Sequence, residues 1–406
     1  MKRWIWFFGG FVFALGLLAV LLFGTLQYLK RQDITVEPPR LDYTSEAFPV
    51  QDRVARFEQP DAAADSGLVR NVVLFLADGM GTSMLSATSA LEHGPAGAFG
   101  FERMEAVGLM RTYSANDLVT DSAAGATALA SGYKANNRMV GATADGPVES
   151  IAERLKAQGF AVGLVTSSYV TDASIGAFAA HVANRDSTQR IARQLATSPM
   201  DLIIGGADYS MSPDVLELAR SSGFVVSNEI GFPQTAPEDR LLVTLPGRSF
   251  FGYAGPPLED VTRFAFERLA ATGRPFFLFI EQEETDTAGH RNNLGRVRRG
   301  MVELDAAVTA GLQLASDEGD TLVLLTADHD TGGVGITQGK YRLGEAIVHW
   351  LTTKHTSQYV PFFAQGPGSH HFEGIFDNTE VPSRLANLLG IGPFPSPVRP
   401  DSAEME

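Results

Sequence analysis

Short apolar runs recur through the middle of the chain, and segments with helical periodicity separate several of them. The six runs are Val72–Ala77, Val162–Thr166, Leu202–Gly205, Phe276–Ile280, Thr321–Ala327 and Val360–Ala364. The helical segments are Ser150–Phe160, Val261–Ala271 and Met301–Ala315. Strands that are apolar throughout and alternate with helices are typical of a parallel sheet covered on both faces. The sequence therefore predicts an α/β fold with a mostly parallel central sheet and helices on both faces.

This alternating region extends from about residue 70 to 391, and we expect it to form one domain. Residues 34–69 contain four prolines and a small polar stretch, which is typical of a linker. Residues 392–406 form a second proline-rich segment, a C-terminal tail.

The N-terminus, residues 1–33, contains 23 residues without a charge, from Trp4 to Leu26. As a helix this run would be about 34 Å long, enough to cross a bilayer core. We interpret it as an uncleaved signal anchor, a transmembrane helix. A cleaved signal peptide is the alternative and would leave a secreted protein. The flanking basic residues favour a position of the main domain outside the cytosol, on the periplasmic or extracellular side.

Composition excludes several classes of protein. The chain has no cysteine, which excludes a disulfide scaffold, a thiolate metal site and a catalytic thiol. Its net charge is −15, whereas a nucleic-acid-binding protein needs clustered lysine and arginine, so no nucleic acid binding is expected. An acidic balance can reflect solubility alone, or acids that are metal ligands.

Acids and histidines follow four of the apolar runs. They are Asp78 after the first run, Asp172 and Ser174 after the second, Glu281, Asp286 and His290 after the fourth, and Asp328 with His329 after the fifth. Ligands of α/β proteins bind beyond the carboxyl ends of the strands, so these side chains are expected to meet at one edge. His355 precedes the last run and could lie near either end of it.

These side chains suit divalent metals. Mixed histidine and carboxylate donors favour zinc, and positions with oxygen donors only favour magnesium. Asp286 and His290 are four residues apart, so one helical turn would bring both to one face. Any one acid taken alone could equally be a helix cap, and Asp328-His329 alone could be a surface turn.

Ser122 begins a segment of small residues that is predicted to be a helix. It could be a capping serine, or a nucleophile at a helix N-terminus, where backbone N–H groups favour anions. A nucleophilic serine would need a base or a metal to activate it. No Gly-x-Ser-x-Gly motif surrounds Ser122, so a Ser-His-Asp hydrolase is not supported.

These motifs resemble those of the alkaline phosphatases. The matching blocks are Asp78-Gly-Met-Gly, Thr120-Asp-Ser-Ala-Ala-Gly-Ala-Thr-Ala, Glu281 with Asp286 and His290, Asp328-His329 and His355-Thr, in the family's order over about residues 71–391. The resemblance implies hydrolysis of small phosphate monoesters through a phosphoserine. It also implies two zinc ions and one magnesium ion, and a homodimer as one option.

The resemblance assigns a role to each residue. Ser122 matches the nucleophile, and Arg185 matches an arginine that binds phosphate. The first zinc would be held by Asp286, His290 and His355, the second by Asp78, Asp328, His329 and Ser122, and magnesium by Asp78, Glu281 and Ser174. Asp121 and Asp172 match supporting residues. The sequence departs from other members at Asp172, where some carry histidine, and at Thr287, where some carry a basic residue.

Three alternatives stay open. A phosphodiesterase of the same superfamily would use similar residues, and the ratio of monoester to diester turnover separates the two. A sulfatase is disfavoured because Ser122 is followed by Ala-Ala-Gly rather than the Pro-x-Arg context of that class. A non-catalytic, anchored metal-binding or phosphate-binding protein would not be expected to keep the complete residue set. The pair His370-His371 has no role in this scheme and is expected at the surface.

Overall fold

A computed structural model describes residues 69–228, 235–246, 255–340 and 345–395. The predicted anchor, nearly all of the linker and the tail beyond residue 395 lie outside these residues. No helix among the described residues has the length and apolar character needed to cross a membrane.

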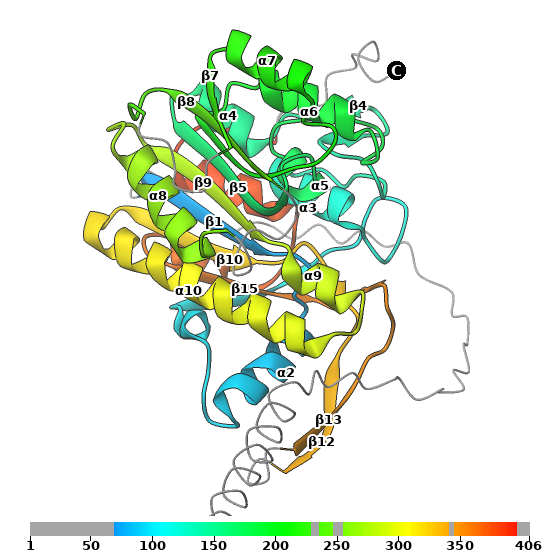
Figure 1. Cartoon of the computed structure of the whole chain (residues 1–406). Coiled ribbons are helices and arrows are strands. Elements are labelled where there is room, and N and C mark those ends of the chain that lie inside the picture. The colour runs from blue at the N-terminus through cyan, green and yellow to red at the C-terminus, as the bar shows by residue number, and fades with distance from the viewer. Residues whose placement is uncertain (1–68, 229–234, 247–254, 341–344, 396–406) are drawn as a thin grey trace, which may run out of the picture.

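A central sheet of ten strands organises the domain (Figure 1). The strands are β1 (Asn71–Ala77), β2 (Ala106–Arg111), β5 (Ala161–Tyr169), β6 (Leu202–Ala207), β7 (Phe224–Ser227), β8 (Arg240–Pro246), β9 (Phe276–Gln282), β10 (Thr321–Thr326), β15 (Val360–Gln365) and β16 (Gly374–Asp377). Their order is β16-β2-β15-β10-β1-β9-β5-β6-β8-β7. Only β15 within this sheet, as far as it is described, pairs antiparallel, with β10 and β2. The prediction of a mostly parallel sheet is confirmed.

Helices cover both faces of the sheet. They are α2 (Thr82–His93), α3 (Ser122–Ser131), α4 (Ile151–Ala157), α5 (Ala173–Gly176), α6 (Thr188–Thr197), α7 (Pro213–Ser221), α8 (Leu258–Ala270), α9 (Glu284–Gly289), α10 (Leu294–Glu318) and α11 (Glu380–Leu388), with short 3₁₀ helices at Gly100–Arg103 and Ser369–Phe372. Two phenylalanines of β9, three positions apart and so on opposite faces of the strand, contact opposite helical layers. Phe276 packs against Phe266 of α8, whereas Phe279 packs against Phe178, which follows α5. Both layers are therefore anchored on the same buried strand.

Local sequence signals explain where two of the predicted helices begin. The Ser150 hydroxyl accepts from the Glu153 N–H, and the Glu153 side chain accepts from the Ser150 N–H, so α4 starts with a capping box. Helix α10 begins seven residues before the predicted Met301, because the Asn293 side chain accepts from the Arg296 N–H and caps an earlier turn.

The register of the three central strands sets the position of the site. Leu76 of β1 lies beside Glu281 of β9 and beside Thr326 of β10. The residues that come after these strands therefore emerge together at one edge, as the sequence predicts.

Three small two-stranded sheets lie outside the central one. They are β3 (Ala142–Thr143) with β4 (Gly146–Pro147), β11 (Asp330–Thr331) with β14 (His355–Thr356), and β12 (Gly335–Lys340) with β13 (Glu345–His349). Figure 1 shows β12 and β13 extending away from the sheet. Pairing of Thr331 with His355 brings His355 to the loop after β10.

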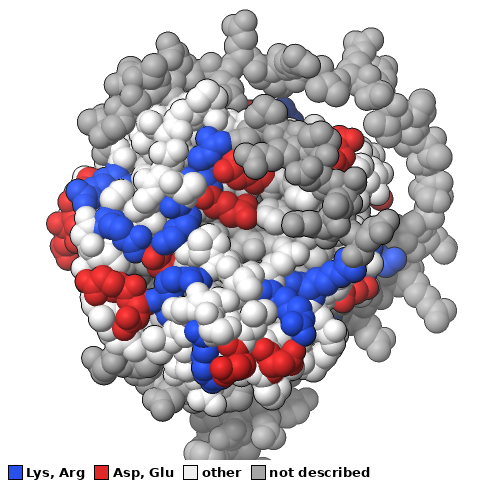
Figure 2. Space-filling view, turned by 90° about the horizontal axis from the view of Figure 1, so that it is seen from above, with Lys and Arg blue, Asp and Glu red and all other residues white. Residues whose placement is uncertain are grey.

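Charged side chains are interspersed on the face of the molecule shown in Figure 2. Blue lysine and arginine groups alternate there with red acidic groups rather than forming one broad basic field.

Candidate active site

Three buried carboxylates mark the centre of the candidate site. Asp78 follows β1, Glu281 lies near the end of β9, and Asp328 comes two residues after β10. Their exposed fractions are 2%, 0% and 0%. Buried carboxylates are stable only when they are paired, hydrogen-bonded, protonated or bound to a metal, so this edge of the sheet needs positive charge.

Ser122 is the first residue of α3, as predicted. Asp121 precedes it and caps the helix, its side chain accepting from the Ala124 N–H at 3.0 Å. Ser122 is buried, and its Oγ lies 3.1 Å from His329 Nε2. The capping role that the sequence left open for Ser122 thus belongs to Asp121, and the serine hydroxyl faces the site.

A close approach of two backbones holds α3 against the loop that carries Asp328. A Cβ on Gly125 would lie 2.8 Å from the Asp328 carbonyl oxygen and 3.2 Å from the Asp328 Cβ. Only glycine permits this contact without a shift of the chain. The contact fixes the distance between Ser122 and the Asp328-His329 loop.

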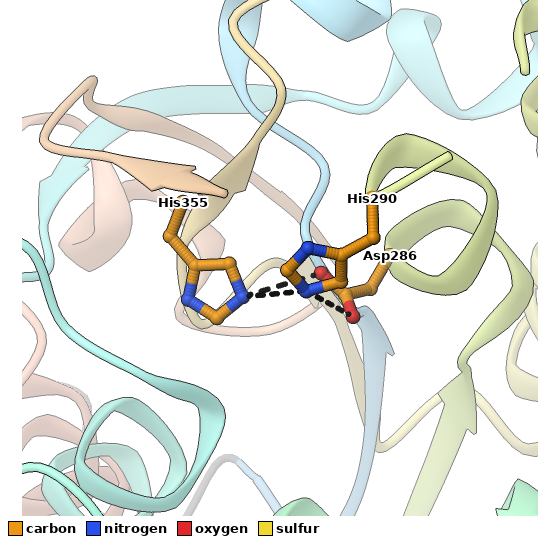
Figure 3. A group of neighbouring side chains, drawn as sticks. All are labelled: Asp286, His290 and His355. Carbon is orange, nitrogen blue, oxygen red and sulfur yellow. Dashed lines mark hydrogen bonds and ion pairs between the residues drawn. The ribbon is translucent and has the colours of Figure 1, made fainter. Parts of the chain in front are cut away.

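Asp286, His290 and His355 form a first cluster (Figure 3). His290 Nε2 lies 3.3 Å from Asp286 Oδ2, and His355 Nε2 lies 3.5 Å from Asp286 Oδ1. The two imidazole Nε2 atoms are 3.1 Å apart. Helix α9 and its end supply Asp286 and His290, and the small strand β14 supplies His355. Atoms this close, from three residues, could hold one cation.

Backbone carbonyls orient both imidazoles. His290 Nδ1 donates to the Thr353 carbonyl at 2.8 Å, and His355 Nδ1 donates to the Thr120 carbonyl at 2.9 Å. Because a carbonyl only accepts, the proton of each neutral ring is on Nδ1 and the lone pair is on Nε2. Two lone pairs then face one another beside a carboxylate, an arrangement that a shared proton or metal ion relieves.

His329 is oriented in the same way by a hydroxyl. The Thr331 hydroxyl donates to Asp286 Oδ1, so its oxygen can accept from His329 Nδ1, 3.2 Å away. The His329 Nε2 lone pair therefore points toward Ser122. The Thr331 hydroxyl thus connects His329 to Asp286 of the first cluster.

A second cluster surrounds His329 Nε2. This atom lies 3.3 Å from Asp78 Oδ1 and 3.4 Å from Asp328 Oδ2. Burial, followed by the charge of Asp286, raises the pKa of Asp328 to about 7. Burial lowers the pKa of His329, so the ring is held neutral, the form in which histidine binds metals.

A third cluster contains only oxygen donors. Carboxylate atoms of Asp78, Glu281 and Glu283 lie within 4.8 Å of one another. Ser174 Oγ donates to Asp78 Oδ2 at 3.3 Å, and the Thr166 hydroxyl donates to Glu281 Oε2. Burial, followed by the charge of Asp172, raises the pKa of Glu281 to about 8. Without a cation, these acids would tend to keep protons at neutral pH.

The donor sets fit divalent metals. Asp78 Oδ1, Glu281 Oε1 and Asp328 Oδ2 are buried, and within the described part of the chain they have no hydrogen-bond partner. Such orphaned oxygens are costly unless a cation binds them. The first and second clusters combine imidazole nitrogen with oxygen, which suits zinc, and the oxygen-only cluster suits magnesium.

Arg185 reaches the site from the loop before α6. Its guanidinium lies 3.1 Å from Asp172 and 3.5 Å from Asp121, with 26% of its side chain exposed. Asp172 also caps α5 and accepts from Ser168 Oγ at 2.6 Å. Asp121 and Asp172, the two acids predicted to support the site, therefore both contact Arg185 and orient its guanidinium at the edge of the site.

The structure brings together every predicted site residue. Sequence reasoning missed Glu283, Thr331 and Thr166. Glu283 had a usable signal, since it comes two residues after Glu281 in an acidic run. His370 and His371 lie in the 3₁₀ helix after β15, which runs antiparallel to β10 and so ends at the opposite edge of the sheet.

A buried serine at a helix N-terminus, an arginine guanidinium and three clusters that could each hold a cation are together typical of a metal-dependent hydrolase of anionic esters. The comparisons with known proteins agree with this class. The family model described as alkaline phosphatase matches residues 69–215 and 252–349. The chain therefore belongs to the alkaline phosphatase family.

Individual relatives extend over most of the chain. Alkaline phosphatase 4 of Bacillus subtilis is 25% identical over 431 residues, covering 83% of this chain and 93% of the relative. Streptomycin-6-phosphate phosphatase of Streptomyces griseus is 27% identical, covering 79% and 91%. The solved alkaline phosphatase of the Antarctic bacterium TAB5 is 28% identical, with a TM-score of 0.73, covering 79% of this chain and 98% of that one. The chain is a phosphatase that hydrolyses phosphate monoesters, and its family implies divalent metals.

Proposed function

We propose that Ser122 is the nucleophile of this phosphatase and that the reaction passes through a phosphoserine. The observation that carries the proposal is the position of Ser122 Oγ, at the start of α3 and 3.1 Å from His329 Nε2. There the hydroxyl lies beside the cation-binding clusters and the positive end of the helix dipole.

We assign zinc to the cluster of Asp286, His290 and His355 and to the cluster of Asp78, Asp328, His329 and Ser122. Magnesium is assigned to Asp78, Glu281 and Ser174. When bound, the cations would acidify the attacking hydroxyl and water and neutralise the charge of the carboxylates. A variant of the TAB5 enzyme was solved with magnesium bound in its M3 site, which supports an oxygen-liganded third metal here.

The chain's own residues then account for two displacements at phosphorus. Ser122 Oγ forms a bond to phosphorus while the bond from phosphorus to the alcohol oxygen breaks, and the proton released from Ser122 is balanced, through solvent, by protonation of the departing alcohol oxygen. Water then attacks the phosphoserine, the bond from phosphorus to Ser122 Oγ breaks, and a proton from the water returns to Ser122 Oγ as inorganic phosphate is released. Arg185 can donate from two guanidinium nitrogens to two phosphate oxygens and so fix their orientation.

The test is phosphate release from p-nitrophenyl phosphate by the full chain with zinc and magnesium. Ser122→Ala should lower turnover by at least about a thousandfold, because the covalent route is lost. Ser131→Ala, at the other end of α3, is the matched control and should retain activity. An active Ser122→Ala enzyme would refute the nucleophile assignment. Faster release from bis-p-nitrophenyl phosphate than from the monoester would favour the diesterase alternative.

We also propose that the uncharged run from Trp4 to Leu26 anchors the enzyme, with the catalytic domain outside the cytosol. The length of the run and the basic residues on both sides support this. Membrane fractionation with protease protection tests it, and an N-terminus that begins after residue 26 in the mature protein would show cleavage instead. Sedimentation of the full chain tests the homodimer that the family resemblance suggests.

A further inference from the structure

We propose that Glu283 is an additional carboxylate ligand of the third metal site. The site would then have three protein carboxylates, Asp78, Glu281 and Glu283, and would bind magnesium more tightly than the first two could. This inference rests on the proposed function only for the identity of the site.

The position of Glu283 is set by the end of β9. Glu281 and Gln282 are the last two residues of the strand, and Glu283 follows them with a helical backbone conformation as the residue that precedes α9. The Glu283 N–H donates to Ser167 Oγ of β5 at 2.7 Å. The backbone of Glu283 is thereby fixed to the neighbouring strand, and its side chain turns toward the same buried edge as Glu281.

The carboxylate of Glu283 is itself held in place. Its Oε1 accepts from Thr287 Oγ1 at 2.8 Å, one turn along α9. The residue is 8% exposed. A carboxylate oxygen has more than one lone pair, so Oε1 can accept from this hydroxyl and still contact a cation. Hydroxyl support of this kind orients the ligands of metal sites.

A second observation, the presence of buried carboxylate oxygens without a hydrogen-bond partner in the described part of the chain, supports a cation in this cluster. Glu281 Oε1 is fully buried, and in the part of the chain that the structure describes no group hydrogen-bonds it. Asp78 Oδ1 is likewise buried and has no hydrogen-bond partner among the described residues. The Asp78 and Glu281 carboxylates each place an oxygen within 4.8 Å of a carboxylate oxygen of Glu283, a spacing that allows all three residues to contact one ion.

The chemistry of the donors selects the ion. The Asp78, Glu281 and Glu283 carboxylates and the nearby Ser174 hydroxyl are hard oxygen ligands, and no imidazole belongs to this cluster. Hard divalent cations such as magnesium prefer such sets, whereas zinc prefers the imidazole-containing clusters on the other side of Asp78. Glu283 therefore adds both affinity and a preference for magnesium.

The experiment titrates magnesium alone into the zinc-loaded full chain after dialysis against magnesium-free buffer, with calorimetry and elemental analysis as readouts. Glu283→Gln should weaken magnesium binding by at least about tenfold and leave zinc content unchanged. Glu284→Gln is the matched control, because that neighbouring carboxylate points to Arg296 at 2.7 Å and not to the cluster. It should bind magnesium within about twofold of wild type.

Wild-type magnesium affinity in Glu283→Gln would overturn the proposal and leave Glu283 as a buried acid bonded to Thr287. If Glu283→Gln does not fold, Glu283→Asp keeps the charge and withdraws the oxygens by about one bond length. Unchanged affinity in that variant would also refute direct ligation. The phosphatase assignment is tested separately, because Ser122→Ala should bind magnesium as wild type does whether or not it hydrolyses phosphate esters.

Discussion

The histidine cluster and the carboxylate cluster belong to the same site, but they differ in their exposure to solvent. In the first, Asp286, His290 and His355, the His290 side chain is 40% exposed. In the third cluster, which contains the Asp78, Glu281 and Glu283 carboxylates, no residue is more than 8% exposed. Metal sites that bind substrate or water keep an open position, whereas closed sites serve structure and charge. The comparison indicates that exchange with solvent occurs at the histidine side.

The two clusters also differ in how protons bind to them. Burial acts to raise the pKa of Asp286, but hydrogen bonds with His290 and His355, which form when the cluster shares a proton, outweigh it and hold the pKa well below its usual range. Burial raises the pKa of Glu281 to about 8, and nearby acids add to the effect. Without a metal, the histidine cluster therefore favours an ionised Asp286, and the carboxylate cluster favours a protonated Glu281.

Removal of all metals should have the largest effect. Chelation should abolish activity, and the metal-free chain should lose stability as pH rises from about 5 to about 8. In this window folded Glu281 and Asp328 still bind protons that the unfolded chain has released, so stability falls with pH. Thermal unfolding of the chelated full chain at each pH is the measurement, and added zinc and magnesium should remove the alkaline loss.

Two variants of the chelated chain separate the clusters. Glu281→Gln should flatten the alkaline loss, because it removes a buried acid that must ionise. Asp286→Asn should instead remove stability that is present above about pH 4 and lost as pH falls through the depressed pKa of Asp286. Identical pH profiles for the two variants would contradict the contrast between the clusters.

The loaded enzyme should show the same division in its metal content. His290→Ala should release zinc, retain magnesium and lower turnover by at least about a hundredfold, because a cation ligand is lost from the open side. Glu281→Gln should release magnesium, retain zinc and cost about tenfold in turnover. Elemental analysis and steady-state kinetics on the same preparations check both. Loss of both metals together in either variant would mean that the clusters are not separable.

Much of this division could be predicted from the sequence, because it depends on the residues at the carboxyl end of each strand. Asp78, Glu281 and Asp328 are fixed by strand ends, and apolar runs locate those ends. His355 could not be placed, because it lies in the two-residue strand β14 and no pattern of that length has a period. The strand β2 was also missed, since its burial alternates and half of its side chains are exposed or partly exposed.

The hydroxyl of Thr331 shows a further limit of sequence reasoning. A lone threonine after Asp328-His329-Asp330 has no distinctive pattern, yet it contacts both Asp286 and His329. Thr331→Val should weaken zinc binding by about ten- to a hundredfold with little change in magnesium binding, since it removes the group that sets the His329 tautomer. Competition with a zinc chelator measures this. Equal chelator sensitivity in wild type and variant would show that the tautomer is set elsewhere.

The smallest expected effect concerns the start of α3. Asp121→Ala removes a helix cap and should lower the free energy of unfolding by about 1 kcal/mol. It also removes one acid facing Arg185, 3.5 Å away, so binding of inorganic phosphate should change less than about tenfold in either direction. Denaturant unfolding and phosphate inhibition measure the two effects. A loss of zinc in this variant would show that Asp121 acts on the clusters as well as on the helix.

The contact between Gly125 and the Asp328 backbone means that α3, which begins at Ser122, and the loop that carries Asp328 and His329 can move only together. The gap between α3 and the loop leaves no space for one methyl group. How closely α3 approaches this loop is therefore limited by a contact with the main chain rather than by adjustable side chains. A shift of α3 must be accompanied by a shift of the loop that carries Asp328 and His329. The packing of these two elements therefore helps to keep Ser122 in place beside His329.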